Sequence, residues 1–209
     1  MQMFCYILLM SENKNLTINE IFTLAAQNHQ ENNFQVAAEL YEKIIKINPN
    51  HLNALNNLGV VFDRLKEYQK AMDCYKKIIK INPKNATAFN NLGSTLKELG
   101  ESQKAKECYE KAIKIDPNYT NAYYNIGIIF GELGEYYKAI DSYERTIEIS
   151  PYYKNAHNNL GNSFRALGEY QKAKNCYEKA IEIDSDFSGA LGNVAGIYIT
   201  ELNDFEKAI

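Results

Sequence analysis

Apolar side chains recur along this chain at the spacing of one helix face. Within residues 52–85, four of them lie at i, i+3, i+7 and i+10, namely Leu55, Leu58, Phe62 and Leu65. That spacing is typical of an amphipathic α-helix with one face turned to a core. A second amphipathic stretch runs from about Tyr68 to Ile81. The pattern therefore predicts two helices within 34 residues.

Short breaks separate the predicted helices. Lys66 and Glu67 lie between the two stretches just described, and a Gly-Glu dipeptide takes their place in the next three copies of the pattern. Glycine can adopt the left-handed conformation that ends a helix. Asn82 and Pro83 end the second stretch, because proline has no amide hydrogen and disfavours helix in the residue before it.

The same pattern returns every 34 residues. Proline, glycine, alanine and tyrosine each keep this spacing over most of the chain. Such a fixed period indicates a stacked-repeat protein, which has an elongated surface instead of one globular core. The prolines are Pro49, Pro83, Pro117 and Pro151, and the tyrosines are Tyr41, Tyr75, Tyr109, Tyr143 and Tyr177.

The period also sets the expected organisation of the chain. Thr17 and Glu20 form a capping-box sequence, so the helices are expected to begin near Ile18, after a poorly ordered lead-in over residues 1–17. The expected repeats are 18–51, 52–85, 86–119, 120–153 and 154–187, followed by a truncated repeat over 188–209.

The sequence also leads to an expectation at each end of the chain. The first ten residues are apolar but too short to span a bilayer, and translation from Met1 or from Met10 is left open. The last repeat stops five residues into its expected second helix, at Ile209. Because a terminal repeat normally needs a completed polar cap, we expect the chain to be a fragment of a longer protein.

Composition excludes several classes of function. With 23 basic and 26 acidic residues the chain lacks the basic excess of a nucleic-acid binder, and we expect no membrane partner. Cys74, Cys108 and Cys176 share one repeat position, and equivalent residues of neighbouring repeats lie too far apart for a disulfide. We therefore expect these cysteines to be packing residues in a reducing, cytoplasmic compartment. The sequence contains no nucleophile–base pair, phosphate loop or metal spacing, so we expect no enzyme activity, cofactor or metal.

The repeat resembles a known family. Its openings read NALNNLG, NATAFNNLG, NAYYNIG and NAHNNLG, followed by an aromatic residue, a fixed alanine, a tyrosine and a closing proline. This 34-residue unit resembles the tetratricopeptide repeat, although the family's early tryptophan is missing. The resemblance implies an all-α, right-handed α-solenoid of stacked antiparallel helix pairs. It also implies that the first helices line a concave groove that binds extended peptides.

Asparagines are the candidate site residues at this implied groove. An amide side chain offers both donors and an acceptor, which matches a peptide backbone without reading its side chains. Asparagines of this kind resemble those in O-linked N-acetylglucosamine transferase repeats, but they can equally bridge neighbouring repeats or reflect an Asn-rich composition. The main series is Asn57, Asn91, Asn125, Asn159 and Asn193; one turn upstream are Asn53, Asn121 and Asn155; Tyr124 stands where other copies have Asn56, Asn90 and Asn158.

Three functions remain open from the sequence. The first is a non-enzymatic scaffold that binds an extended peptide or partner in the groove, with added stacking from Tyr119, Tyr124, Tyr152 and Tyr153. The alternative is the substrate-recruiting arm of a larger enzyme, such as a glycosyltransferase, whose catalytic domain follows residue 209. The third is a self-associating array joined through open repeat ends. The groove positions lack the lysines and arginine of a carboxylate clamp for chaperone tails.

Overall fold

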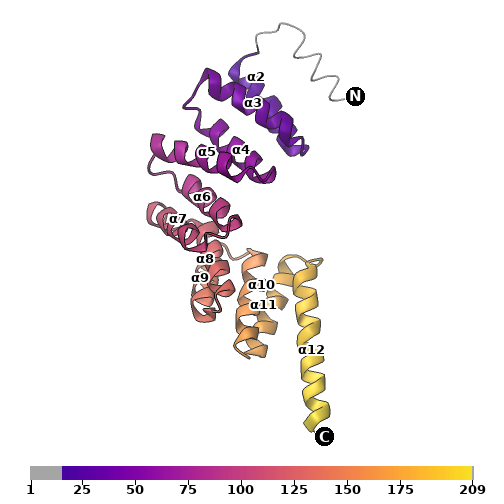
Figure 1. Cartoon of the computed structure of the whole chain (residues 1–209). Helices are drawn as coiled ribbons and strands as arrows, with labels where there is room; N and C mark the ends of the chain where they lie inside the picture. Colours follow the sequence, from indigo (N-terminus) through magenta and orange to yellow (C-terminus); the bar gives the residue numbers. More distant parts are fainter. Residues whose placement is uncertain (1–15, 209) are drawn as a thin grey trace. The chain divides into compact units, whose positions relative to one another are not determined.

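The protein is described by a computed structural model that covers the backbone of residues 16–208 and the side chains of residues 16–199. Every helix or strand among these residues is an α-helix (Figure 1). The predictions for residues 1–15, including the start at Met1 or Met10, lie outside the described residues. The first helices of the pairs are α2 (Ile18–Gln30), α4 (Leu52–Arg64), α6 (Ala86–Glu98), α8 (Thr120–Glu132) and α10 (Lys154–Ala166); the second helices are α3 (Phe34–Ile47), α5 (Tyr68–Ile81), α7 (Ser102–Ile115), α9 (Tyr136–Ile149) and α11 (Tyr170–Ile183); α12 (Ser188–Ala208) follows.

The first described helix begins where the capping sequence predicts. The backbone N–H of Thr17 donates to the Glu20 carboxylate at 2.8 Å, and the Thr17 hydroxyl accepts from the Glu20 N–H at 3.3 Å. These reciprocal bonds satisfy two amides that a helix start otherwise leaves without partners. The predicted start near Ile18 is therefore confirmed.

The helices stack in consecutive pairs within two compact units, one ending at Thr95 and one beginning at Leu96. In the first unit, α3 packs against α2 and α4, and α4 packs against α5. In the second unit, α9 packs against α8 and α10, and α11 packs against α10 and α12. The second helices α3, α9 and α11 thus each contact the first helix of their own pair and that of the next. The predicted fold class, an α-solenoid of stacked antiparallel helix pairs, is confirmed.

The last helix differs from the prediction. The 34-residue period predicts a turn and the start of a second helix before Ile209, but α12 runs without a break from Ser188 to Ala208. The three preceding pairs break at a glycine, for example Gly168, which has a φ of +77°. Because the last repeat carries one extra residue, Asn203 aligns with Gly168. Asparagine pays a steric cost in the left-handed conformation that glycine does not pay, so the turn is less favoured at this position.

A close contact between glycine and tyrosine lies within the α4–α5, α8–α9 and α10–α11 pairs. Gly127 of α8 faces the buried ring of Tyr143 of α9, and a Cβ at Gly127 would lie 2.6 Å from Cε1 of that ring. The same distance recurs at Gly59 and Gly161. No heavy atom fits at such a distance, so only glycine allows the two helices to approach this closely around the ring.

The turn between α4 and α5 lacks the glycine of its successors. Lys66 has a φ of +60°, and Gly100 holds the equivalent place with a φ of +78°. After the turn, the N–H of Glu67 donates to the carbonyl of Phe62 at 2.8 Å, which is the bond of a Schellman motif. The turn therefore requires a residue in the left-handed conformation, and Lys66 adopts this conformation at a steric cost of about 1 kcal/mol.

Substitution of Gly127 by alanine should separate α8 from α9. We expect Gly127→Ala to lower the free energy of unfolding by about 1–3 kcal/mol, because the new methyl group overlaps the Tyr143 ring. Gly192→Ala in α12 is the matched control, since nothing lies within 4 Å of a Cβ there. It should raise stability by about 0.5–1 kcal/mol through helix propensity. Urea unfolding followed by circular dichroism measures both; equal effects of the two variants would contradict the packing account.

Substitution of Lys66 by glycine should stabilise the first unit. We expect Lys66→Gly to raise the free energy of unfolding by up to about 1 kcal/mol, because glycine adopts a positive φ without a steric cost. The reverse change, Gly100→Ala, should lower it by a similar amount. Urea unfolding again provides the measurement, and a destabilised Lys66→Gly variant would rule out backbone strain at this turn.

Candidate functional site

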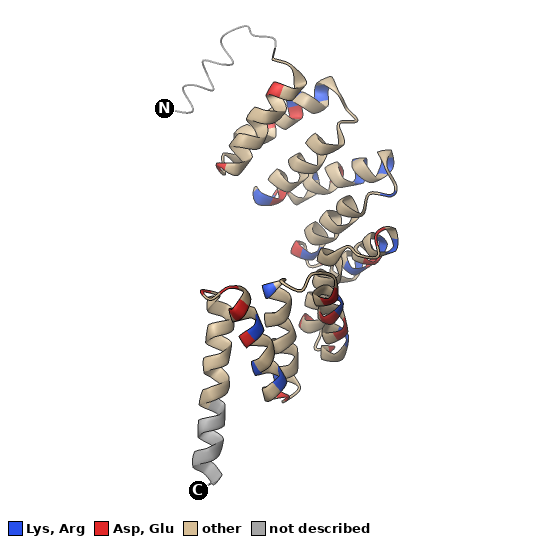
Figure 2. Cartoon of the chain, turned by 180° about the vertical axis from the view of Figure 1, so that it is seen from behind, with Lys and Arg blue, Asp and Glu red and all other residues tan. Residues whose placement is uncertain are grey.

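The first helices carry their charges at their ends. In α4, α6 and α8 every charged residue lies in the last two positions, for example Asp63 and Arg64 in α4. The second helices instead carry interspersed charges of both signs (Figure 2), including i,i+3 ion pairs such as Lys172 with Glu169. Such exposed pairs contribute little to stability. The surface that the central turns of these first helices present is uncharged and rich in asparagine.

In the first unit, the predicted asparagines form a chain of hydrogen bonds from pair to pair. The Asn57 amide donates to the Tyr41 hydroxyl at 3.1 Å, and Asn91 donates to Oδ1 of Asn56 at 3.1 Å. Within each helix, Asn56 donates to Asn57 at 3.4 Å and Asn90 donates to Asn91 at 3.3 Å. The chain therefore connects α3, α4 and α6.

The second unit repeats this arrangement with one substitution. Asn159 donates to the Tyr124 hydroxyl at 3.2 Å, and Asn193 donates to Oδ1 of Asn158 at 3.0 Å. Asn158 in turn donates to Asn159 at 3.3 Å, and Asn193 also reaches Asn162 at 3.1 Å. Tyr124 thus replaces an amide acceptor by a hydroxyl acceptor and preserves the link between α8 and α10.

These bonds leave part of the hydrogen-bonding capacity of Asn57 unused. Asn57 donates one of its two N–H groups and accepts one hydrogen bond, so one N–H and one lone pair remain. Its side chain is half-buried, as are those of Asn91, Asn125, Asn159 and Asn193. The structural bridging left open by the sequence is therefore present, and Asn57 keeps one donor and one acceptor beyond it.

The upstream asparagines lie closer to solvent. Asn53, Asn121 and Asn155 are all exposed. Asn53 lines a hollow of about 350 Å³ in the first unit, together with Asn56 and Asn57. This hollow joins members of two predicted series in one surface. Its remaining lining residues are Phe22, Leu52, Asn85 and Thr87.

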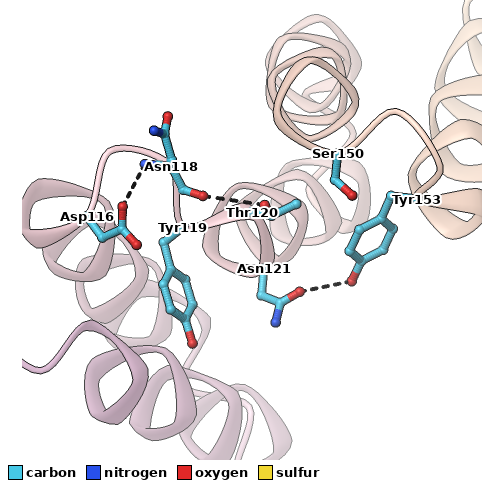
Figure 3. A pocket seen from close by; sticks show the side chains of 7 residues that line it. All are labelled: Asp116, Asn118, Tyr119, Thr120, Asn121, Ser150 and Tyr153. Carbon is cyan, nitrogen blue, oxygen red and sulfur yellow. Dashed lines mark hydrogen bonds between the residues drawn. The ribbon is translucent and has the colours of Figure 1, made fainter.

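A second hollow, of about 390 Å³, lies in the second unit (Figure 3). The Tyr153 hydroxyl donates to Oδ1 of Asn121 at 3.2 Å, and the Tyr153 ring lies against that of Tyr124 with centroids 4.9 Å apart. Burial raises the pKa of both phenols. Asn155 lines neither hollow. The full lining is Asp116, Asn118, Tyr119, Thr120, Asn121, Ser150 and Tyr153.

Sequence reasoning missed Asp63, which links two pairs in the first unit. Its carboxylate accepts from the Tyr75 hydroxyl at 2.8 Å and from the Thr95 hydroxyl at 2.8 Å. Burial and the Asp63 charge together raise the pKa of Tyr75. The available signal was that Asp63 is acidic where the equivalent positions carry Lys97, Gly131 and Arg165.

The remaining candidate chemistry fits a packing role. Cys74, Cys108 and Cys176 are free, as predicted, and burial raises the pKa of Cys74 to about 12, so this thiol stays protonated at neutral pH. Among the described residues, no three histidine, cysteine or acidic side chains gather where they could hold a metal ion. None of the described helices combines the length and apolarity needed to cross a membrane.

Family models of the tetratricopeptide repeat match residues 52–85, 86–119 and 119–186. No curated protein sequence matches the chain. Together the matched segments span well over half of the 209 residues.

Solved structures show the same architecture. A crystal structure of MamA protein is 27% identical, with a TM-score of 0.66, over 80% of this chain and 92% of MamA. YrrB, described as a TPR protein with an unusual peptide-binding site, is 22% identical over 90% of this chain and 96% of its own, with a TM-score of 0.61. A TPR protein of Thermus thermophilus is 19% identical over 88% of this chain and 100% of its own, with a TM-score of 0.71. The chain belongs to the tetratricopeptide repeat family, whose repeats are generally non-catalytic modules for protein interaction.

Proposed function

We propose that this chain is a non-enzymatic scaffold that binds an extended peptide segment of a partner protein along its first helices. The observation that carries this proposal is the hollow of the first unit, where Asn53, Asn56 and Asn57 gather on an uncharged surface. YrrB is itself described as having a peptide-binding site, so this fold is able to carry one.

The asparagine surface suits a peptide backbone better than a charged ligand. An extended peptide presents alternating N–H and C=O groups, and Asn57 has one donor and one acceptor left for them. Because the hydrogen-bonded chain already orients the amides, less side-chain freedom is lost on binding. Each bond contributes about 0.5–1.5 kcal/mol net, so an affinity on the order of micromolar, which takes about 8 kcal/mol, needs several such bonds together with apolar contacts.

The same proposal places the protein in the cytoplasm. The described cysteines are free thiols, which fits a reducing compartment.

Replacement of Asn53 should weaken peptide binding without unfolding the protein. The probes are dodecapeptides selected from a random library on the wild-type chain, with affinity measured by fluorescence anisotropy. We expect Asn53→Ala to raise Kd about three- to tenfold, because the exposed amide lines the hollow and its loss removes about one hydrogen bond. The melting temperature should stay close to that of the wild type.

Asn175→Ala is the matched control for this experiment. Asn175 is an exposed asparagine on α11, a second helix, where it accepts a hydrogen bond from Gln171. Its substitution should leave Kd unchanged. The proposed function fails if the selection yields no binding peptide, or if Asn53→Ala binds the selected peptides as tightly as the wild type does.

A further inference from the structure

The two hollows occupy related places in the repeat but differ in chemistry. Asn85 lines the hollow of the first unit, and the residues 34 and 68 positions later, Tyr119 and Tyr153, both line the hollow of the second. Thr87 and Asn121 are likewise one period apart. The first hollow is therefore mostly amide-lined, whereas the second has two phenol rings together with the amides of Asn118 and Asn121 and the Asp116 carboxylate.

The ring of Tyr153 in the second hollow is held in place by Asn121 and Tyr124. Tyr153 is fixed by its hydrogen bond to Asn121 and by the tilted stack of its ring on Tyr124, with an interplanar angle of 35°. Tyr124 in turn accepts from Asn159 at 3.2 Å. In Figure 3, Tyr119 and Tyr153 lie on either side of Asn121. The hollow thus offers preorganised aromatic surface, which can bind an apolar ring with little loss of side-chain entropy.

The polar groups around these rings favour a ligand rich in acceptors. Asn121 uses its carbonyl oxygen for Tyr153, whereas its N–H groups and the Tyr119 hydroxyl have no hydrogen-bond partner among the described residues. The Asp116 carboxylate accepts a hydrogen bond from the N–H of Asn118 at 3.0 Å. The Ser150 hydroxyl adds a further donor at the rim. A segment that presents carbonyl oxygens but few N–H groups fits this set of donors.

We propose that the Tyr119–Tyr153 hollow is a specificity subsite for a proline residue in the bound peptide. Proline supplies a flat apolar ring for the phenol faces, has no N–H of its own, and holds the chain in an extended polyproline II conformation with exposed carbonyl groups. Aromatic-lined grooves are a recurring mode of binding such segments. This inference rests on the proposed function and adds that the second unit selects a side chain, while the amides of the first unit bind backbone.

The test compares two labelled probes on the full chain. Fluorescein-labelled decaproline and a labelled Gly-Ser decapeptide of equal length are titrated in fluorescence anisotropy. We expect decaproline to bind at least about tenfold more tightly, which corresponds to about 1.4 kcal/mol. Equal affinities, or no measurable binding of decaproline, would overturn the proline subsite.

Substitutions in the hollow assign the binding to this site. Tyr119→Ala should weaken decaproline binding about tenfold, whereas Tyr119→Phe, which keeps the ring, should stay within about threefold of the wild type. Tyr137→Ala is the matched control, because this tyrosine of α9, a second helix, is 69% exposed and does not line the hollow. Circular dichroism verifies that each variant keeps its helix content. If the Kd of decaproline is the same for Tyr119→Ala as for the wild type, decaproline binds elsewhere and the inference is wrong.

The outcomes separate this inference from the proposed function. If selected dodecapeptides bind in an Asn53-dependent manner but decaproline does not bind, the proline subsite is wrong and the peptide scaffold stands. If neither class of peptide binds, both proposals fail.

Discussion

The close approach of glycine to tyrosine within the α4–α5, α8–α9 and α10–α11 pairs is the contact on which the rest of the structure depends. A Cβ at Gly59, Gly127 or Gly161 would lie 2.6 Å from the facing tyrosine ring, so the spacing of the two helices leaves no room for another residue. This spacing fixes where the second helix presents its other face to the next pair. Stacking then supplies the core that one helix pair alone cannot bury.

The asparagine network depends on that stacking. The amides of Asn91 and Asn193 each reach an asparagine 35 positions earlier, and such bonds form only if neighbouring first helices keep a constant offset. The network therefore has two consequences. It helps to fix the register of the pairs, and it fixes the orientation of the amides that the proposed peptide would meet. In the account proposed here, stability and peptide binding share the same side chains, and a substitution within the network affects both.

The sequence predicted the helix pairs well because every feature that bounds them is local. The capping box at Thr17 lies directly at the start of a helix, and the residues that end each helix recur every 34 residues close to the helix ends. The contacts between pairs were harder to predict, because the period shows that Asn56 and Asn91 are equivalent to other asparagines but not which atoms meet. Asp63 was missed for this reason, since its partners Tyr75 and Thr95 come from two other helices. The uninterrupted α12 shows a different limit, because the period predicted a turn at a position without the glycine that forms one.

The central claim is that a peptide binds to the amide side chains of the first helices, and side-chain NMR tests it most directly. In a 15N-labelled sample, the NH2 signals of Asn53 and Asn57 should shift on titration with a selected dodecapeptide, because their N–H groups meet the ligand backbone. The signal of Asn175 on α11 should stay in place. Saturable shifts confined to the second helices, with Asn53 and Asn57 unmoved, would contradict the account.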